Sequence, residues 1–233
     1  MSVDPKQLND LNKETYDAIA PLFSSTRGYL WDELKHFAEF VQDGDAILDI
    51  GCGNGRLYQA FKNLQVSYTG MDQSKGLIDI AKKQVPEGEF VVADMTDLPF
   101  EDETFNNIFV IASFHHLPSV EMREKALLEM KRVLKPGGHI LMTNWNLHSK
   151  FAQKTVEKGK WQLDDSKQDF VIPWYTGQKK VLGERYYYGF YMEELEDLFK
   201  GAGLELEEQF FIKKGKKAGV VKGFNIISIV SKK

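Results

Sequence analysis

The segment that most restricts the fold is a short apolar run followed directly by three closely spaced glycines. Residues 46–50 read Ala-Ile-Leu-Asp-Ile, and Gly51, Gly53 and Gly55 come next, before a helical stretch near residues 57–61. A buried strand that enters a glycine turn and then a helix is typical of open α/β sheets, which bind ligands at the carboxyl ends of their strands. Such a sheet needs further strands and helices in alternation.

The rest of the chain supplies this alternation. Periodicity predicts helices at residues 6–19 and 31–41 before the first strand, and a late helix at 193–199. Further strands are expected at residues 66–71, 90–93, 108–112, 140–143, 204–212 and 224–230, and further helices at 76–83 and 120–134, the last one stopped by Pro136 and two glycines. This order predicts an α/β fold with a mostly parallel seven-stranded sheet and helices on both faces.

Residues 145–190, after the fifth strand, interrupt the alternation of strands and helices. The segment is too long for a structureless connection in a compact domain, so it is interpreted as a functional insertion. Nine aromatic residues lie between Trp161 and Tyr191. We therefore expect a single domain over residues 1–233, with an N-terminal helical cap at about 1–42 and a lid or substrate insertion at about 145–190.

Composition and charge exclude several classes of protein. The one cysteine, Cys52, excludes an internal disulfide and a multi-cysteine zinc site. No apolar run approaches the roughly 18 residues of a membrane span, and the N-terminus lacks the apolar core of a signal peptide, so we expect a cytoplasmic protein without a membrane partner. The net charge of −4 argues against a protein that coats nucleic acids non-specifically. The charge is uneven along the chain, however, with −8 for residues 1–149 and +4 for residues 150–233. The C-terminal part can therefore meet an anionic partner.

The glycine spacing also restricts the ligand. A dinucleotide fingerprint, G-x-G-x-x-G, needs glycine at position 56, where this chain has Arg56. Asp49 places a carboxylate beside the loop, which would repel a pyrophosphate but attract an ammonium or sulfonium group. S-adenosylmethionine, with its cationic methionine end and no phosphate, fits this loop.

Acidic residues also follow the next two strands. Asp72 ends the second strand, where an acidic side chain can accept hydrogen bonds from both ribose hydroxyls of an adenosine. Asp94 and Met95 follow the third strand, where they can contact the adenine amine and ring. Together with the glycine loop, this pattern resembles the class I S-adenosylmethionine-dependent methyltransferases over about residues 44–145.

The resemblance implies a role for each matching position. Asp49 and the glycine loop would line the methionine end of the cofactor, and the carbonyl of Ala112 would meet its ammonium group. The complete set of cofactor-binding residues implied in this way is Tyr16, Asp49, Gly51, Cys52, Gly53, Gly55, Asp72, Gln73, Asp94, Met95 and Ala112. No metal ligands are implied.

Two other segments resemble a narrower family. Residues 16–27 (YDAIAPLFSSTR) and Trp31 are similar to the N-terminal signature of the wobble-uridine tRNA methyltransferases, which esterify 5-carboxymethyluridine in the anticodon. Residues 168–174 (QDFVIPW) and 184–191 (ERYYYGFY) resemble two later blocks of that family in the same order. The chain departs from the family by lacking a long basic insertion, and by having Tyr188 and Gln73 where histidine and arginine are usual.

The narrower resemblance implies the site of chemistry. Arg27 and Arg185 are candidates to clamp the substrate carboxylate, because a guanidinium can bind it through two hydrogen bonds. His116 follows the fourth strand, directly after His115, and would orient the uridine or the carboxylate. Tyr186 would form a hydrogen bond to the base or stack on it. The RNA backbone would meet Lys154, Lys158, Lys160, Lys179, Lys180 and the lysines of residues 213–217. The implied partners are a tRNA anticodon loop and a small activator subunit, with no DNA.

Two alternatives remain open at this point. One is a small-molecule O- or C-methyltransferase that uses His116 as a general base near neutral pH. The other is a non-catalytic subunit that binds S-adenosylmethionine and activates a partner.

Overall fold

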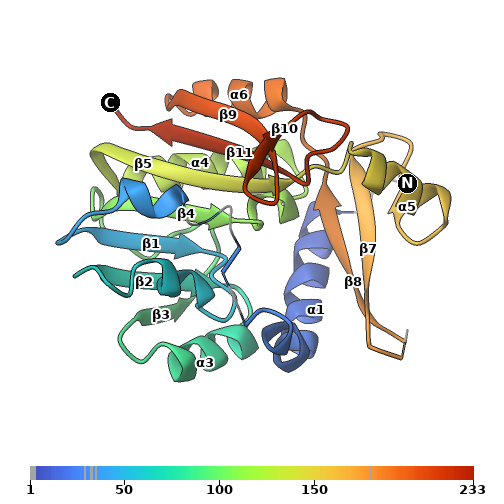
Figure 1. The fold of residues 1–233 in the computed structure, drawn as a ribbon, viewed down its shortest axis with the longest axis horizontal. Helices are drawn as coiled ribbons and strands as arrows, with labels where there is room; N and C mark the ends of the chain where they lie inside the picture. The colour runs from blue at the N-terminus through green and yellow to red at the C-terminus, as the bar shows by residue number, and fades with distance from the viewer. Residues whose placement is uncertain (1–3, 29, 32–33, 35, 179) are drawn as a thin grey trace.

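The computed structural model describes residues 4–28, 30–31, 34, 36–178 and 180–233 (Figure 1). Within them, the main sheet consists of eight strands: β1 (Ala46–Ile50), β2 (Ser67–Asp72), β3 (Glu89–Val92), β4 (Phe105–Ile111), β5 (Leu134–Trp145), β9 (Glu205–Lys213), β10 (Lys216–Ala218) and β11 (Asn225–Ser231). Their order is β10-β9-β11-β5-β4-β1-β2-β3. The strands from β3 to β5 pair in parallel, whereas β11 is antiparallel to both neighbours. The carboxyl ends of β1, β2 and β4 therefore meet at one edge of the sheet.

The predicted mostly parallel sheet is confirmed, with one strand more than the seven expected. The additional strand is β10, which folds back on β9 through a tight turn where Lys214 and Gly215 have φ angles of 50° and 72°. The strand expected at residues 140–143 begins earlier, at Leu134, so that Pro136 lies inside β5 instead of in a loop. The β4–β5 register is irregular at this point, which is how a strand accommodates a proline.

Helices cover both faces of the main sheet. The helices of the described residues are α1 (Pro5–Ser25), α3 (Lys75–Gln84), α4 (Val120–Val133), α5 (Lys150–Glu157) and α6 (Met192–Gly201), with the 3-10 helices η1 (His36–Phe40), η2 (Arg56–Ala60) and η3 (Phe114–His116). On one face, α4 and α6 pack against Ile108 and Val110 of β4. The alternate residue Phe109 points to the opposite face, where it contacts Phe37 and Phe61.

Two predicted helices differ in the structure. The helix expected near residues 57–61 is the short η2, because Gly55 at its start has a left-handed φ of 77° and the turn ends at Ala60. Of the helix expected at residues 31–41, positions 32–33 and 35 lie outside the described residues, and η1 covers the remainder from His36 to Phe40. None of the helices in the described part of the chain has the length and apolar character of a membrane span.

The insertion after β5 forms a smaller antiparallel sheet of β6 (Gln162–Leu163), β7 (Asp169–Tyr175) and β8 (Val181–Tyr188). Helix α1 lies between this sheet and the main sheet (Figure 1). The Asn12 side chain of α1 accepts from the backbone N–H of Tyr186 at 2.7 Å and donates to its carbonyl at 3.1 Å. Thr15 donates to the carbonyl of Glu184 at 2.7 Å. These side chains give β8, at the edge of the small sheet, the hydrogen bonds that another strand would supply.

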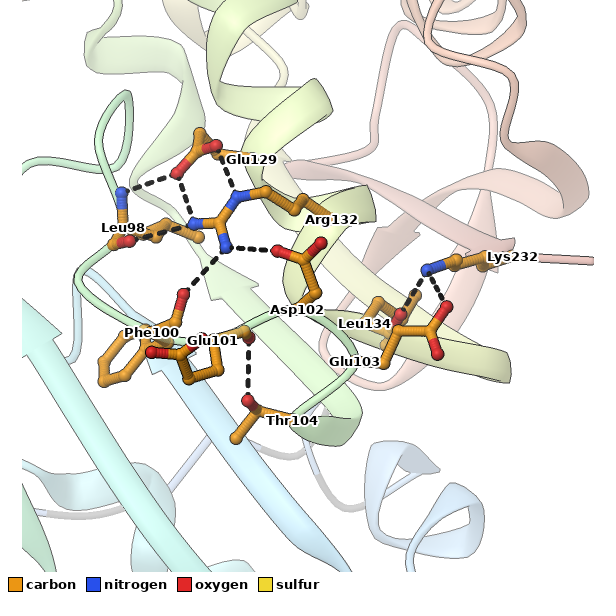
Figure 2. Close-up of polar contacts among 10 residues, drawn as sticks. All are labelled: Leu98, Phe100, Glu101, Asp102, Glu103, Thr104, Glu129, Arg132, Leu134 and Lys232. Carbon is orange, nitrogen blue, oxygen red and sulfur yellow. Dashed lines mark hydrogen bonds and ion pairs between the residues drawn. The ribbon is translucent and has the colours of Figure 1, made fainter.

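Arg132 of α4 fixes the loop that follows β3, as Figure 2 shows. Its guanidinium donates to the carbonyls of Leu98 and Phe100 at 3.0 and 2.7 Å, and to the carboxylates of Glu129 and Asp102. Glu129 also accepts from the backbone N–H of Leu98 at 2.9 Å. The loop is therefore held at several points, and its start lies at the carboxyl end of β3, beside the predicted ligand site.

Candidate active site

A cavity of about 1140 Å³, including its open mouth, lies at the carboxyl ends of β1, β2 and β4. The glycine loop after β1 forms one wall, and α1 with β8 of the small sheet forms the other. The lining runs from the glycine loop and the ends of β1 and β2 to Arg185 and Tyr187 of β8, so the cavity has two halves with different walls.

The glycine loop follows the cavity wall closely. Gly51 and Gly53 line the cavity with φ angles of 72° and 58°. A Cβ on Gly51 would lie 2.4 Å from the Cβ of Ser113, so only glycine fits there. Cys52 also lines the cavity, and burial raises the pKa of its thiol, which keeps it neutral. Gly55, predicted as a ligand contact, does not line the cavity; its left-handed φ starts η2, and its Cα faces the ring of Phe90.

Replacing Gly51 with alanine is expected to destabilise the protein by at least about 3 kcal/mol, because the new Cβ adds a collision with Ser113 to the strain of a left-handed residue. The matched control is Gly137→Ala, where φ is 75° but no atom lies within 4 Å of the added Cβ. That variant should lose only about 1–2 kcal/mol. Urea unfolding of both variants measures the difference, and equal losses would contradict the close packing of the loop.

Asp49 presents an unpaired carboxylate oxygen at the cavity. Its Oδ2 accepts a hydrogen bond from the Tyr68 hydroxyl at 2.5 Å, while Oδ1 has no hydrogen-bond partner among the described residues. The side chain is buried and lines the cavity, and burial raises the pKa of the carboxyl to about 7. A buried oxygen without a partner is costly, so this atom is suited to receive a cationic ligand.

Asp72 lies beside Asp49 at the end of the neighbouring strand. One oxygen accepts from the backbone N–H of Gly53 at 3.0 Å, and the other accepts from that of Ser74 at 2.9 Å. The protein surroundings raise the pKa of this carboxyl to about 6, mainly through desolvation. Both carboxylates line this half of the cavity, where they can accept hydrogen bonds from an ammonium group and from hydroxyls.

Asp94 is placed differently from the prediction. It does not line the cavity; its Oδ1 accepts from the backbone and hydroxyl of Thr96, each at 2.8 Å, and its Oδ2 accepts from the Gln73 amide at 2.8 Å. Gln73 and Met95 do line the cavity. Asp94 therefore orients the Gln73 amide at the wall, and of these three residues only Gln73 and Met95 face the cavity.

Ala112 closes this half of the cavity in a strained conformation. Its φ is 53°, in the left-handed region that residues with a Cβ rarely adopt. Its N–H is held by the carbonyl and the hydroxyl of Thr143, both at 3.0 Å. Backbone strain of this kind persists where the surrounding structure enforces it, and it concentrates at ligand sites.

The other half of the cavity contains a chain of hydrogen bonds between α1, η3 and β8. The Tyr16 hydroxyl lies 3.0 Å from His116 Nε2, and His116 Nδ1 lies 2.8 Å from the carbonyl of Tyr186. Because a carbonyl only accepts, Nδ1 carries the proton and Nε2 accepts from Tyr16. Arg185 donates to the hydroxyls of Tyr16 and Tyr187 at 3.3 and 2.6 Å. The chain fixes the orientation of all four side chains.

His116 is neutral in this arrangement. Burial lowers the pKa of its imidazole to about 3, and the nearby charge of Arg185 contributes to the shift. An imidazole with this pKa is a poor general base at neutral pH, since proton transfer is efficient only when the pKa lies near the working pH. His115 is fully buried, accepts from the Trp145 backbone N–H at 3.2 Å and stacks on Tyr187, so it supports the wall from behind.

Arg27 and Arg185 both line the cavity, and both lie near the ring of Trp174. Their guanidinium carbons lie 5.8 and 5.0 Å from the centroid of the indole, which attracts cations through its π face. Arg185 is 4% exposed, and its Nε has no hydrogen-bond partner. Within the described residues, no carboxylate forms an ion pair with either arginine. A buried guanidinium without a counter-charge is unfavourable, so the site calls for an anionic ligand.

The prediction that Tyr186 acts at the substrate is wrong. Successive side chains of a strand point to opposite faces, so Arg185 and Tyr187 face the cavity whereas Tyr186 faces away. The Tyr186 hydroxyl donates a short hydrogen bond to Asp169, and the side chain is 1% exposed. Sequence reasoning missed Tyr187, which lines the cavity, and Trp174, which does not line it but lies near both arginines. Side chains of residues 185–187 alternate between the two faces of the strand. Once Arg185 is known to face the cavity, this alternation identifies Tyr187 as facing it too.

The predicted lysines lie on or after α5, around the β9–β10 turn and, for the exposed Lys180, directly before β8; none of those described lines the cavity. Lys154 and Lys158 are exposed on and just after α5, and Lys216 and Lys217 are exposed on β10. Lys179 lies outside the described residues.

Comparison with known proteins adds the following relationships. A family model described as a methyltransferase domain matches residues 48–142. The chain is 33% identical over 192 residues to a putative methyltransferase of Encephalitozoon cuniculi, covering 82% of this chain and 85% of the relative. It is 42% identical over 130 residues to a tRNA (carboxymethyluridine(34)-5-O)-methyltransferase of Arabidopsis thaliana, covering 56% of this chain but only 31% of that protein.

A solved structure also has the same fold. The putative methyltransferase in a complex with the Trm112 methyltransferase activator of Haloferax volcanii superposes with a TM-score of 0.69. The superposition covers 94% of this chain and 96% of that one, at 19% sequence identity.

Proposed function

This chain belongs to the class I S-adenosylmethionine-dependent methyltransferases, and we propose that it esterifies the carboxylate of 5-carboxymethyluridine at the wobble position of tRNA. The observation that carries the proposal is the buried Arg185 guanidinium, which faces the cavity without a counter-charge among the described residues. A carboxylate in the acceptor half of the cavity would supply that charge.

The donor half suits S-adenosylmethionine. The unpaired Oδ1 of Asp49 would accept from the ammonium of the methionine end, and Asp72 would accept from the ribose hydroxyls. Gln73 and Met95 would contact the adenine. Gly51 would let the main chain approach the ligand. When bound, the cofactor supplies an electrophilic methyl group on a sulfonium.

The reaction requires no base. A carboxylic acid with a pKa of roughly 4 is already ionised at neutral pH. The carboxylate oxygen would form the new bond to the methyl carbon as the carbon–sulfur bond breaks, and the electron pair of that bond would stay on the neutral thioether, so no proton would have to move. Arg185 and Arg27 would hold the carboxylate through charge-assisted hydrogen bonds. Tyr16 and the neutral His116 would fix the position of Arg185.

In this proposal the N-terminal segment and the insertion after β5 have complementary roles. We propose that residues at about 1–42 act as a cap and residues at about 145–190 as a lid, within a single domain over 1–233. Tyr16 and Arg27 of the cap and Arg185 and Tyr187 of the lid line the acceptor half, so the proposal assigns this half to the two segments together. The proposal places the protein in the cytoplasm with its tRNA substrate.

The proposal also includes a small activator subunit, like the one that the Haloferax volcanii methyltransferase binds. The edge strand β3 is one surface on which such a subunit can dock, since it ends the main sheet and its Val92 is half exposed.

Incubation with labelled S-adenosylmethionine and total tRNA, followed by digestion to nucleosides, tests the proposal. We expect label in a uridine ester that mild alkali hydrolyses. Label in another nucleoside, or only in a fraction without RNA, would overturn the proposal. The small-molecule alternative, with His116 as general base, is not favoured by a histidine that is neutral and fully engaged in hydrogen bonds.

The pH profile separates the two enzymatic mechanisms. At saturating donor, kcat should vary by less than about twofold between about pH 6 and pH 9, because the acceptor carboxylate and Arg185 keep their charges across this range. His116→Gln should lower kcat by no more than about tenfold and leave the profile flat, whereas loss of a general base costs roughly 10²–10⁴-fold. A rise through neutrality that His116→Gln abolishes would contradict this prediction.

A further inference from the structure

Two large aromatic side chains are exposed next to each other at the end of the small sheet. Phe151 of α5 is 59% exposed, and Phe224, just before β11, is 39% exposed. Their ring centroids lie 6.2 Å apart in an edge-to-face arrangement, although the residues are far apart in sequence. Val221, 57% exposed, extends the same apolar surface. We name Phe151, Phe224 and Val221 the aromatic surface; a contiguous apolar patch of this kind usually marks a binding site.

The aromatic surface is connected to the cavity by a continuous series of rings. Phe151 contacts Trp161 at 5.9 Å, and Trp161 stacks on Trp145 at 6.4 Å. Trp145 in turn stacks on Tyr187 at 4.9 Å, with 23° between the ring planes. Trp145 and Tyr187 both line the cavity. The packed rings therefore fix the position of the aromatic surface relative to the cavity.

The segments that carry the aromatic surface are strongly basic. Residues 150–160 and 213–222 contain nine lysines and a single acidic residue, Glu157. Lys213 Nζ lies 4.6 Å from the centroid of the Phe224 ring. Exposed lysines around exposed rings complement a polyanion that carries flat apolar groups.

The loop that carries Val221 is held in place rather than loosely attached. The Asn146 amide donates to the carbonyls of Val220 and Gly223 at 2.7 and 3.0 Å. The backbone N–H of Lys150, at the start of α5, donates to the carbonyl of Val221 at 3.1 Å. The aromatic surface is therefore pre-organised, and a ligand does not have to order it.

We infer that the aromatic surface is a second binding site, for single-stranded RNA next to the nucleotide that enters the cavity. Bases stack on exposed aromatic rings irrespective of sequence, and lysines neutralise the phosphates between them. The inference rests on the proposed function, since the cavity has to receive a nucleotide of the same strand. The site would hold the nucleotides that flank the modified uridine in the anticodon loop.

A stem-loop oligoribonucleotide with 5-carboxymethyluridine at the wobble position tests the inference by fluorescence anisotropy. The double variant Phe151→Ala/Phe224→Ala should bind this RNA about 10- to 100-fold more weakly, since each stacked base contributes about 1–3 kcal/mol. Its affinity for S-adenosylmethionine should stay unchanged. Phe151→Trp/Phe224→Trp should retain the affinity for RNA. The matched control is Leu128→Ala on α4, an apolar residue 54% exposed outside the aromatic surface, which should have no effect.

The salt dependence of binding tests the lysines separately. Replacing Lys154, Lys158 and Lys222 with glutamine should reduce the slope of log K against log salt by about two, since each single-strand phosphate contact contributes roughly 0.7. Lys82→Gln/Lys83→Gln on α3 is the matched control and should leave the slope unchanged.

The outcomes distinguish this site from the proposed function. If the double phenylalanine variant binds the stem-loop like the unmodified protein while both methylate it, the second site is wrong and the methylation proposal stands. If the unmodified protein binds the stem-loop through the phenylalanines but methylates no RNA, the second site stands and the substrate proposal is wrong. A dimer that the double variant converts to a monomer, with RNA affinity unchanged, would assign the surface to self-association and overturn the inference.

Discussion

Arg185→Ala is expected to lower kcat for methylation of the carboxymethyluridine stem-loop by about 10²- to 10³-fold. The side chain is buried at the cavity, and truncating one partner of a buried, hydrogen-bonded charge pair costs roughly 2–5 kcal/mol. The affinity for S-adenosylmethionine, measured by calorimetry, should change by less than about twofold, because Arg185 lies in the acceptor half.

Controls separate the carboxylate clamp from a general loss of structure. Arg185→Lys keeps the charge but loses the paired geometry of the guanidinium, so it should recover only part of the activity. Arg27→Ala should also keep donor affinity and lose transfer, but by a smaller factor because Arg27 is only half-buried. Unchanged turnover in both alanine variants would remove the clamp from the mechanism.

Asp49→Asn is expected to weaken S-adenosylmethionine binding by about 100-fold and, at the same time, to stabilise the ligand-free protein. The neutral amide attracts an ammonium group far less than a carboxylate does. The stabilisation arises because burial raises the pKa of Asp49 to about 7 from an ordinary value of 3.8. Above pH 7 the buried Asp49 carboxyl of the ligand-free protein is therefore ionised. This lowers the free energy of unfolding by a few kcal/mol.

The sign of the pH dependence follows from this shift. The folded protein binds the Asp49 proton more tightly than the unfolded chain, so stability falls as the pH rises from about 4 to about 7 and is constant above that range. Asp49→Asn should lose this component of the pH dependence, and its melting temperature at pH 8 should exceed that of the unmodified protein. Donor affinity should fall below pH 7 in the unmodified protein. If Asp49→Asn and the unmodified protein bind S-adenosylmethionine equally well, a group other than Asp49 binds the ammonium of the methionine end.

The donor half of the site was predictable because its geometry follows from local sequence and sheet topology. A glycine that must adopt positive φ directly after a buried strand places Asp49 and Gly51 at the carboxyl edge, and parallel pairing brings Asp72 beside them. Asp94 shows the limit of such reasoning. Its position at a strand end was predicted, but the side chain turns back to Thr96 and Gln73, a choice made by local hydrogen bonds.

The acceptor half depends on contacts that sequence order does not contain. In residues 185–188 every side chain is buried or half-buried, so hydrophobicity does not identify which alternate set faces the cavity, and Tyr186 was assigned in place of Tyr187. That choice is made by α1, whose Asn12 binds the backbone of Tyr186. The contact of Trp174 with both arginines likewise appears only when the fold brings Arg27 and Arg185, from distant segments, near its ring.

The position of α1 has a thermodynamic consequence. On one side, Asp17 accepts from the hydroxyl of Ser74 at 2.7 Å and from the backbone of Gly76 at 3.0 Å, at the start of α3. On the other side, Asn12 binds β8, so one helix is a shared wall for both halves of the cavity, to which we assign the methyl donor and the acceptor. Any shift of α1 that one ligand favours changes the free energy of binding the other, and linkage requires this cooperativity to be equal in both directions. Saturation with S-adenosylhomocysteine should therefore alter RNA affinity by the same factor by which RNA alters the affinity for S-adenosylhomocysteine.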